Sequence, residues 1–205
     1  MPSKALKDDI LLNFLNYLQP LKPSLINLAR KNTFKLFLKK NELISLPTDQ
    51  HQECLFFIIK GLVRGFVIDE DKDITTLIAS ENQMLGSIRN HLPGKLKYQE
   101  KFQALEDSEL VVLPYQILDG LYAKFPELNV LARKLLAIQY NFSQERSILS
   151  RIPSAEARYR QFNEANPSVR SRVPVKFLAS YLGMRIETLS RIRMKNKSQK
   201  ASSEV

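Results

Sequence analysis

The chain has 205 residues, of which 44% are hydrophobic and 25% are charged, a composition typical of a folded globular protein. Its single cysteine excludes an intrachain disulfide, and one cysteine with two histidines excludes zinc fingers and cysteine-ligated iron–sulfur clusters within this sequence. The net charge of +10 is concentrated near the C-terminal end, where residues 151–205 carry 12 basic and 4 acidic residues. This imbalance favours a polyanion-binding region, with a solvated basic surface as the alternative.

The cysteine content is typical of a reducing compartment, so we expect a cytoplasmic protein. The longest apolar run, residues 54–59, is too short to cross a membrane, and the early Asp8–Asp9 pair argues against a signal peptide. His51 and His91 are isolated and are interpreted as surface residues, and Cys54 as a small buried hydrophobe. We therefore expect no metal ion, no cofactor and no membrane partner.

Two short helices are predicted at the start of the chain, followed by a β-rich region. Apolar residues recur at helical spacing up to about Pro20, and Ser24 is the predicted cap of a second helix through Leu28. Short strands are then predicted at residues 43–46, 55–59, 62–68, 74–79, 101–105 and 109–113. The acidic segment Asp69–Asp73 predicts a hairpin tip. Such short, evenly spaced strands indicate a small sandwich or jelly roll.

After Pro126 the pattern becomes helical and predicts one long helix up to Pro153, which ends it. Apolar residues step by three and four along it, with Glu145 as the polar exception. The stripe predicts a dimer seam formed by Leu128, Leu131, Leu135, Ile138, Phe142 and Leu149. A helix packed on its own domain is the alternative. Ser154 is the predicted cap of the next helix.

Residues 174–194 have the pattern of a helix-turn-helix. Pro174 suits the first turn of one helix, and Gly183 suits the left-handed position that ends it. The inward positions of the two helices are Leu178, Leu182, Leu189 and Ile192, and Ala179 is small enough for the helices to approach closely. Two short helices locked at a steep angle are the usual DNA-reading unit.

Two side chains of the second helix, Glu187 and Arg191, lie four residues apart and share its outer face. Arginine can donate two hydrogen bonds to guanine, and glutamate can accept one from cytosine, so the pair is predicted to contact bases in the major groove. The alternative is an ion pair that only stabilises the helix. Contacts to DNA phosphates are predicted for Arg172, Lys176, Arg185 and Arg193.

The segment Glu187–Arg191 after Gly183 resembles the recognition helix of the Crp/Fnr family, which includes the cyclic-AMP receptor protein. Residues 56–64 and 104–110 resemble strands of that family's cyclic-nucleotide-binding β-roll, and residues 172–179 the start of its DNA-binding helices. The resemblance covers about residues 30–195. It implies a β-roll sensor, a long dimerisation helix and a helix-turn-helix that binds double-stranded DNA. It also implies base contacts by Glu187 and Arg191, and phosphate contacts by Thr188 and Ser190.

The effector pocket departs from the family pattern. The family uses a Gly-Glu pair for the ribose and an arginine for the phosphate, whereas this sequence has Gly86–Ser87 and, later, Tyr98–Gln99. An uncharged group cannot replace an arginine that binds phosphate through two hydrogen bonds, and Glu100 would repel an anion. We therefore expect a degenerate pocket with little affinity for cyclic AMP and an effector that the sequence does not identify.

Together these patterns predict an α+β protein with three parts. A jelly-roll sensor domain is predicted at residues 1–125, a dimerisation helix at 126–152, and a winged-helix-like DNA-binding domain with a truncated wing and a frayed basic tail at 153–205. The leading hypothesis is a homodimeric transcription regulator that binds an inverted repeat, with RNA polymerase as a further candidate partner. A sensor whose helical end binds another protein is the alternative. No catalytic constellation stands out, so an enzyme is not expected.

Overall fold

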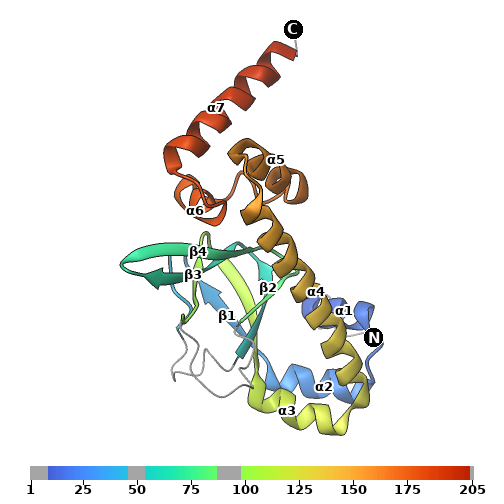
Figure 1. Ribbon diagram of the computed structural model, residues 1–205. Helices are drawn as coiled ribbons and strands as arrows, with labels where there is room; N and C mark the ends of the chain where they lie inside the picture. Colours follow the sequence, from blue (N-terminus) through green and yellow to red (C-terminus); the bar gives the residue numbers. More distant parts are fainter. Residues whose placement is uncertain (1–8, 46–53, 87–97, 204–205) are drawn as a thin grey trace.

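The computed structural model describes residues 9–45, 54–86 and 98–203 (Figure 1). Two helices, α1 (Ile10–Leu18) and α2 (Pro23–Asn32), precede the strands. The strands are β1 (Phe34–Leu38), β2 (Cys54–Lys60), β3 (Val63–Asp69), β4 (Lys72–Ala79), β5 (Met84–Leu85), β6 (Lys101–Ala104) and β7 (Ser108–Pro114). They are followed by α3 (Tyr115–Lys124), α4 (Pro126–Arg151), α5 (Ala155–Ala165), α6 (Val175–Tyr181) and α7 (Ile186–Ser203).

The strands form two antiparallel sheets, ordered β1-β7-β2-β5 and β4-β3-β6, which confirms the predicted roll. Because side chains alternate between the faces of a strand, β2 is buried on both sides. Phe56 and Ile58 lie in the core between the sheets, together with Val63 and Phe102. Phe57 points the other way, into a second core that the helices α1 to α4 form against the outer face of the sheet.

The hairpin between β3 and β4 has its tip where the acidic segment predicted one. Glu70 and Asp71 form the turn with φ angles of 46° and 65°, the left-handed region that tight two-residue hairpins require. Further along the hairpin the register shifts, because Gly65 pairs with Leu77 and Phe66 pairs with Thr75. Thr76 is thus an extra residue in β4, and the bulge leaves backbone groups free for partners outside the sheet.

Several elements differ from the sequence prediction. Residues 43–46 were expected to form a strand, but within the described part of that segment Leu43 makes only an isolated bridge to Gln103. The edge strand β1 and the helix α3 were not predicted as separate elements. Helix α2 begins at Pro23, so Ser24 lies inside it and does not cap it. The polar tail does not fray at Met194, because α7 continues to Ser203 without a glycine or proline to end it.

Helix α4 runs from the N-terminal helices to the C-terminal helices α5 to α7 (Figure 1). The structure corrects the predicted seam: Leu128 and Leu131 are buried in the core with α1 to α3, and Leu135 packs against that core. Leu149 packs at the other end, against the C-terminal helices. Ile138 is half-buried and Phe142 is 46% exposed. The periodicity thus marks mainly the face that packs on the chain's own body.

The opposite face of α4 is exposed and carries three large apolar residues among polar ones. Leu136, Tyr140 and Ile148, at intervals of four and eight residues, are 52%, 62% and 61% exposed. Leu136 and Tyr140 are neighbours on the helix surface, and the row continues through the exposed, polar Gln144 to Ile148, so the three apolar side chains face solvent on the same broad side of the isolated chain. We call Leu136, Tyr140 and Ile148 the outer stripe of α4.

Helices α5, α6 and α7 share a third core that includes Leu178, Leu182 and Leu189, each nearly inaccessible to solvent. Leu62 and Leu105 of the roll belong to the same core. Ser154 caps α5 as predicted, since its hydroxyl accepts a hydrogen bond from the Ala157 amide at 3.2 Å. The C-terminal unit is therefore packed directly on the roll.

Candidate nucleic-acid interface

The turn between α6 and α7 has the geometry that the sequence predicted. Gly183 has a φ of +61°, a conformation that favours glycine, and the Met184 amide donates to the Ala179 carbonyl at 3.0 Å. Ala179 is 1% exposed, in keeping with a close approach of the two helices. The Arg158 guanidinium donates to the carbonyls of Gly183 at 3.3 Å and of Ile152 at 2.6 Å, which ties this turn to the end of α4.

Both predicted base-contacting residues, Glu187 and Arg191, are exposed on the first turns of α7. Helix α7 extends away from the roll, so the roll does not cover this helix (Figure 1). A groove of about 300 Å³ lies between α7 and the start of α5, and Thr188, Arg191 and Lys195 line it on the α7 side. Lys195, whose ammonium lies 3.0 Å from Glu156, was not among the predicted contacts.

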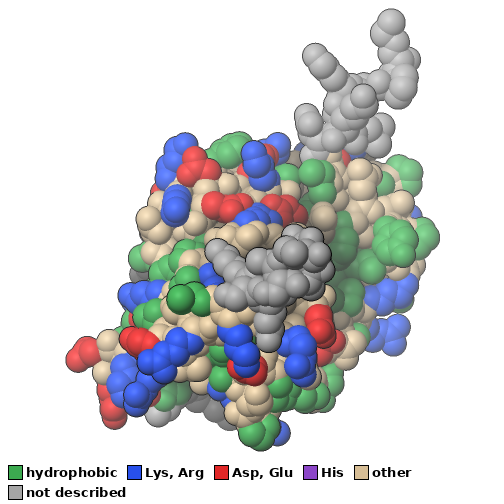
Figure 2. Space-filling view, turned by 90° about the horizontal axis from the view of Figure 1, so that it is seen from above, with side chains coloured by type: hydrophobic (Ala, Val, Ile, Leu, Met, Phe, Trp, Pro, Cys, Tyr) green, Lys and Arg blue, Asp and Glu red, His purple; other side chains and the backbone are tan. Residues whose placement is uncertain are grey.

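The predicted phosphate contacts divide into two groups. Lys176 and Arg185 are exposed, and Thr188 and Ser190 are half-buried beside the base-contacting residues. Lys and Arg side chains lie around this end of the molecule, interspersed with acidic ones (Figure 2). Arg193 instead turns inward, because its guanidinium donates to the Arg170 carbonyl at 3.1 Å and lies 5.8 Å from the ring centroid of Tyr159.

Arg172 does not face solvent as a free cation. Its guanidinium lies between the carboxylates of Glu81, at 2.8 and 2.9 Å, and Glu106, at 2.5 and 3.2 Å. Both carboxylates belong to loops of the roll, 91 and 66 residues earlier in the chain. No local pattern predicted this pairing, and phosphate contact by Arg172 would require it to leave both partners.

The predicted effector pocket is described only in part. Ser87 lies outside the described residues. Gly86 has a φ of +133°, and a Cβ there would lie 2.6 Å from the Cys54 carbonyl oxygen. Tyr98 and Gln99 are exposed, and the Tyr98 hydroxyl donates to Asp69 at 2.9 Å. Thus Tyr98 is bound to the β3–β4 hairpin.

An acidic group, Glu100, lies against the inner strands of the roll. It accepts a hydrogen bond from the Thr76 hydroxyl, and a Cβ at Gly65 would lie 2.6 Å from one of its oxygens. The carboxylate therefore fills the space that glycine leaves open. A negative charge at this position disfavours a phosphate beside it.

Among the described residues, no group of three or more His, Cys, Asp or Glu side chains could hold a metal ion. His51 and His91 lie outside the described residues, and Cys54 is 2% exposed, as expected of a buried hydrophobe. None of the helices in the described ranges is long and apolar enough to span a bilayer.

No family model matches the chain, but its sequence is similar to those of bacterial regulatory proteins. The fumarate and nitrate reduction regulatory protein of Vibrio cholerae is 28% identical over 160 residues, covering 67% of this chain and 59% of that protein. Regulatory protein HlyX of Actinobacillus pleuropneumoniae is 26% identical over 175 residues, covering 76% of this chain and 68% of that protein. The chain thus spans less than two thirds of the length of the Vibrio regulator.

Among solved structures, FixK2 of Bradyrhizobium japonicum has a TM-score of 0.66 with 18% sequence identity, covering 82% of this chain and 86% of that one. At this identity the likeness shows a common fold. It agrees with the order of elements described above, a roll, a long helix and a helix-turn-helix.

Proposed function

We propose that this chain, which is similar in sequence to two bacterial regulatory proteins and in fold to FixK2, is a sequence-specific DNA-binding regulator of the Crp/Fnr type. The observation that carries the proposal is the exposure of Glu187 and Arg191 on a helix that the Gly183 turn holds in a fixed orientation. The groove beside Arg191 and the exposed cations Lys176 and Arg185 supply a surface for the DNA backbone.

The chemistry of base reading follows from the two side chains. Arg191 would donate two hydrogen bonds to guanine N7 and O6, and Glu187 would accept one from cytosine N4. Thr188 and Ser190 would hydrogen-bond phosphates on either side, which sets the register without reading sequence. Selection of bound sites from random duplex DNA tests the whole proposal, since recovery of no enriched sequence would contradict it.

The regulator would act as a homodimer through the outer stripe of α4, Leu136, Tyr140 and Ile148. The observation that favours this surface is an exposed apolar row on a helix whose other face is already buried. Helix pairing gives a two-fold axis, so two copies of α7 would enter successive major grooves. The selected sites should then be inverted repeats with half-site centres about 10 base pairs apart.

We further propose that the roll does not respond to cyclic AMP. The described part of the predicted pocket offers the carboxylate of Glu100 and the hydroxyl of Tyr98, and neither can bind a phosphate in place of arginine.

Replacing Arg191 by alanine is expected to weaken binding to a selected site by about 1–3 kcal/mol, because a bidentate guanine contact is lost. Binding to scrambled DNA should change much less, since phosphate attraction dominates there. Lys176→Ala is the matched control: it removes one exposed cation of the same unit and should weaken both kinds of binding alike. Fluorescence anisotropy on specific and scrambled duplexes measures this, and an equal loss on both for Arg191→Ala would contradict base reading.

A further inference from the structure

Arg172 lies two residues before Pro174, where the chain enters α6, and it bridges the helix-turn-helix unit to the roll. It donates to both oxygens of Glu81 and both oxygens of Glu106. A guanidinium has five N–H groups, and four hydrogen bonds to two carboxylates occupy most of them. In this arrangement Arg172 has little capacity left for a phosphate.

The carboxylates that hold Arg172 are themselves fixed. A Glu81 oxygen accepts the Gly61 amide at 2.9 Å, at the turn between β2 and β3. The hydrogen bonds from Arg172, and those from the backbone, lower the pKa of Glu81 to about 2, so this carboxylate is ionised at neutral pH. Charge-assisted bonds in two directions make the guanidinium a specific joint between two loops and the segment before α6.

A second set of contacts joins the same two units at the other end of α6. The Ser180 hydroxyl accepts the Thr75 amide at 2.9 Å, an amide of the edge strand β4. The ring of Phe177 lies 3.7 Å from the guanidinium carbon of Arg64, which is 3% exposed and paired with Asp73. Helix α6 is therefore attached to the roll at both of its ends.

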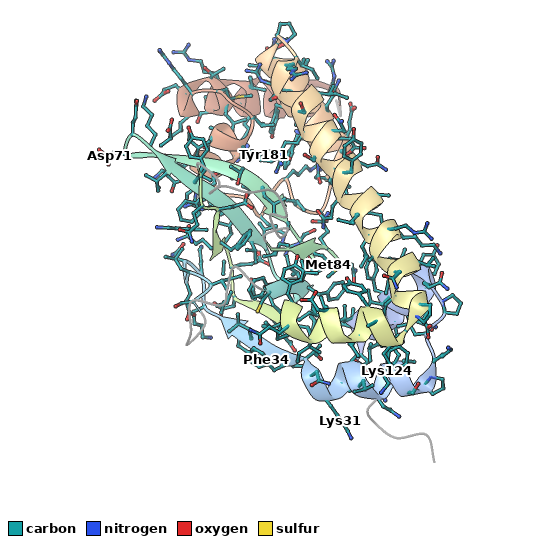
Figure 3. All side chains as sticks on the ribbon, turned by 60° about the horizontal axis from the view of Figure 1, so that its bottom comes forward. Lys31, Phe34, Asp71, Met84, Lys124 and Tyr181 are labelled. Carbon is teal, nitrogen blue, oxygen red and sulfur yellow. The ribbon has the colours of Figure 1, made fainter. Side chains whose placement is uncertain are left out.

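Helix α4 contacts the bulge at Thr76. The guanidinium of Arg146 donates to the Thr76 carbonyl, a backbone group of the bulge. Tyr181, at the end of α6, lies near α4 and near the β3–β4 hairpin (Figure 3). Asp71 is at the tip of that hairpin. Burial raises the pKa of the Tyr181 hydroxyl, with charges on Glu145 and Arg146 also acting on it. The orientation of α6 is thus set by the roll and by α4 together.

We infer that Arg172 is a positioning residue, which holds the helix-turn-helix on the roll through Glu81 and Glu106 and so sets where α7 points, instead of binding a DNA phosphate. The inference rests on the proposed function for its consequence in DNA binding, but the joint itself can be tested without DNA. A positioning role and a phosphate contact differ in a measurable way. If Arg172 is a positioning residue, replacing Glu81 and Glu106 should have the same effect as replacing Arg172.

The DNA-free test measures hydrogen exchange at the Thr75 amide, which is bonded across the junction to Ser180. Arg172→Gln and the double variant Glu81→Gln/Glu106→Gln should both speed this exchange by about 5- to 150-fold, the range of typical coupling energies. Arg170→Gln removes an exposed arginine two residues away and should leave it unchanged. Slow exchange at core amides such as that of Phe56 verifies folding, and an unchanged Thr75 rate in the folded variants overturns the inference.

The DNA test compares the same variants on a selected site at two salt concentrations. Positioning predicts that Arg172→Gln and Glu81→Gln/Glu106→Gln both weaken specific binding, with little change in the salt slope. Phosphate contact predicts that Arg172→Gln lowers the slope by about one, and that freeing the arginine by the double variant tightens binding.

Arg172→Lys separates the two roles further. Lysine keeps the charge but cannot bind both carboxylates through two hydrogen bonds each, so under positioning it should behave like Arg172→Gln. Binding and salt slope like those of the unaltered protein would overturn the inference. If the unaltered protein selects no DNA sequence, the proposed function fails, while the exchange rates still decide whether the joint exists.

Discussion

Replacing Leu136 and Tyr140 together by aspartate is expected to leave the protein monomeric and to weaken its binding to a selected inverted repeat at least about a thousandfold. Specific complexes of dimeric regulators are typically about 10³ to 10⁷ times tighter than nonspecific ones, and a monomer reads only half of the site. Both side chains are more than half exposed, so the substitutions remove little internal packing. Aspartates facing each other across a two-fold axis would repel and would be poorly solvated.

Light scattering and DNA binding, measured on the same samples, check this result. A control with Tyr17→Asp and Ala123→Asp also adds two charges at exposed helical positions, one of them a tyrosine, on α1 and α3. It should remain dimeric and bind DNA normally. A folded Leu136→Asp/Tyr140→Asp protein that is still a dimer would show that the outer stripe is not the contact. Leu135 is unsuitable for this test, because it packs against the core of α1 to α3.

Replacing Gly61 by alanine is expected to lower the free energy of unfolding by about 2–5 kcal/mol, the sum of backbone strain and overpacking. Gly61 has a φ of +107°, which side-chain-bearing residues rarely adopt. An added Cβ would lie 2.2 Å from the Ser108 hydroxyl oxygen and 2.7 Å from the Ser108 Cα, so the neighbouring backbone would have to move. The same shift would displace the amide that Glu81 accepts.

Denaturant unfolding of matched variants measures this effect. Gly120→Ala, within α3, has open space around the new methyl group and should raise stability by up to about 1 kcal/mol, since alanine favours a helix over glycine. The same chemical change therefore has opposite signs at two sites. Equal stabilities of Gly61→Ala and the unaltered protein would mean that the turn can relax without strain.

Local patterns in the sequence predicted the helix-turn-helix and the hairpin tip, because both depend on residues close together in the chain. Gly183 and the inward leucines of α6 and α7 lie within one supersecondary unit, and Glu70 and Asp71 form a turn by themselves. The two residues predicted to contact DNA bases, Glu187 and Arg191, were identified from their positions in this same unit. Their exposure agrees with the prediction, and their contacts with DNA remain to be measured.

Features that depend on distant residues could not be predicted in this way. The period of α4 shows which leucines share a face, but not whether a partner or the chain's own α1 to α3 covers that face. Arg172 looked like a phosphate contact because it is a cation beside a DNA-binding motif. Its partners Glu81 and Glu106 come from loops that only the folded roll brings to it. The sequence shows that Arg172 is a cation, but it does not show that the partner of this cation is a pair of carboxylates from the roll.

The contacts at the Thr76 bulge limit which segments of this protein can be exchanged with those of a related protein. A chimera that combines this roll with the C-terminal unit of another regulator would leave the Thr75 amide without Ser180 and Arg64 without Phe177. Recombination at the α4–α5 linker would thus separate residues that have to change together. We expect that a working chimera also needs Arg172, Phe177 and Ser180 in the new C-terminal unit. The segment that can be exchanged between proteins therefore has to include the residues that contact the roll as well as the proposed recognition helix.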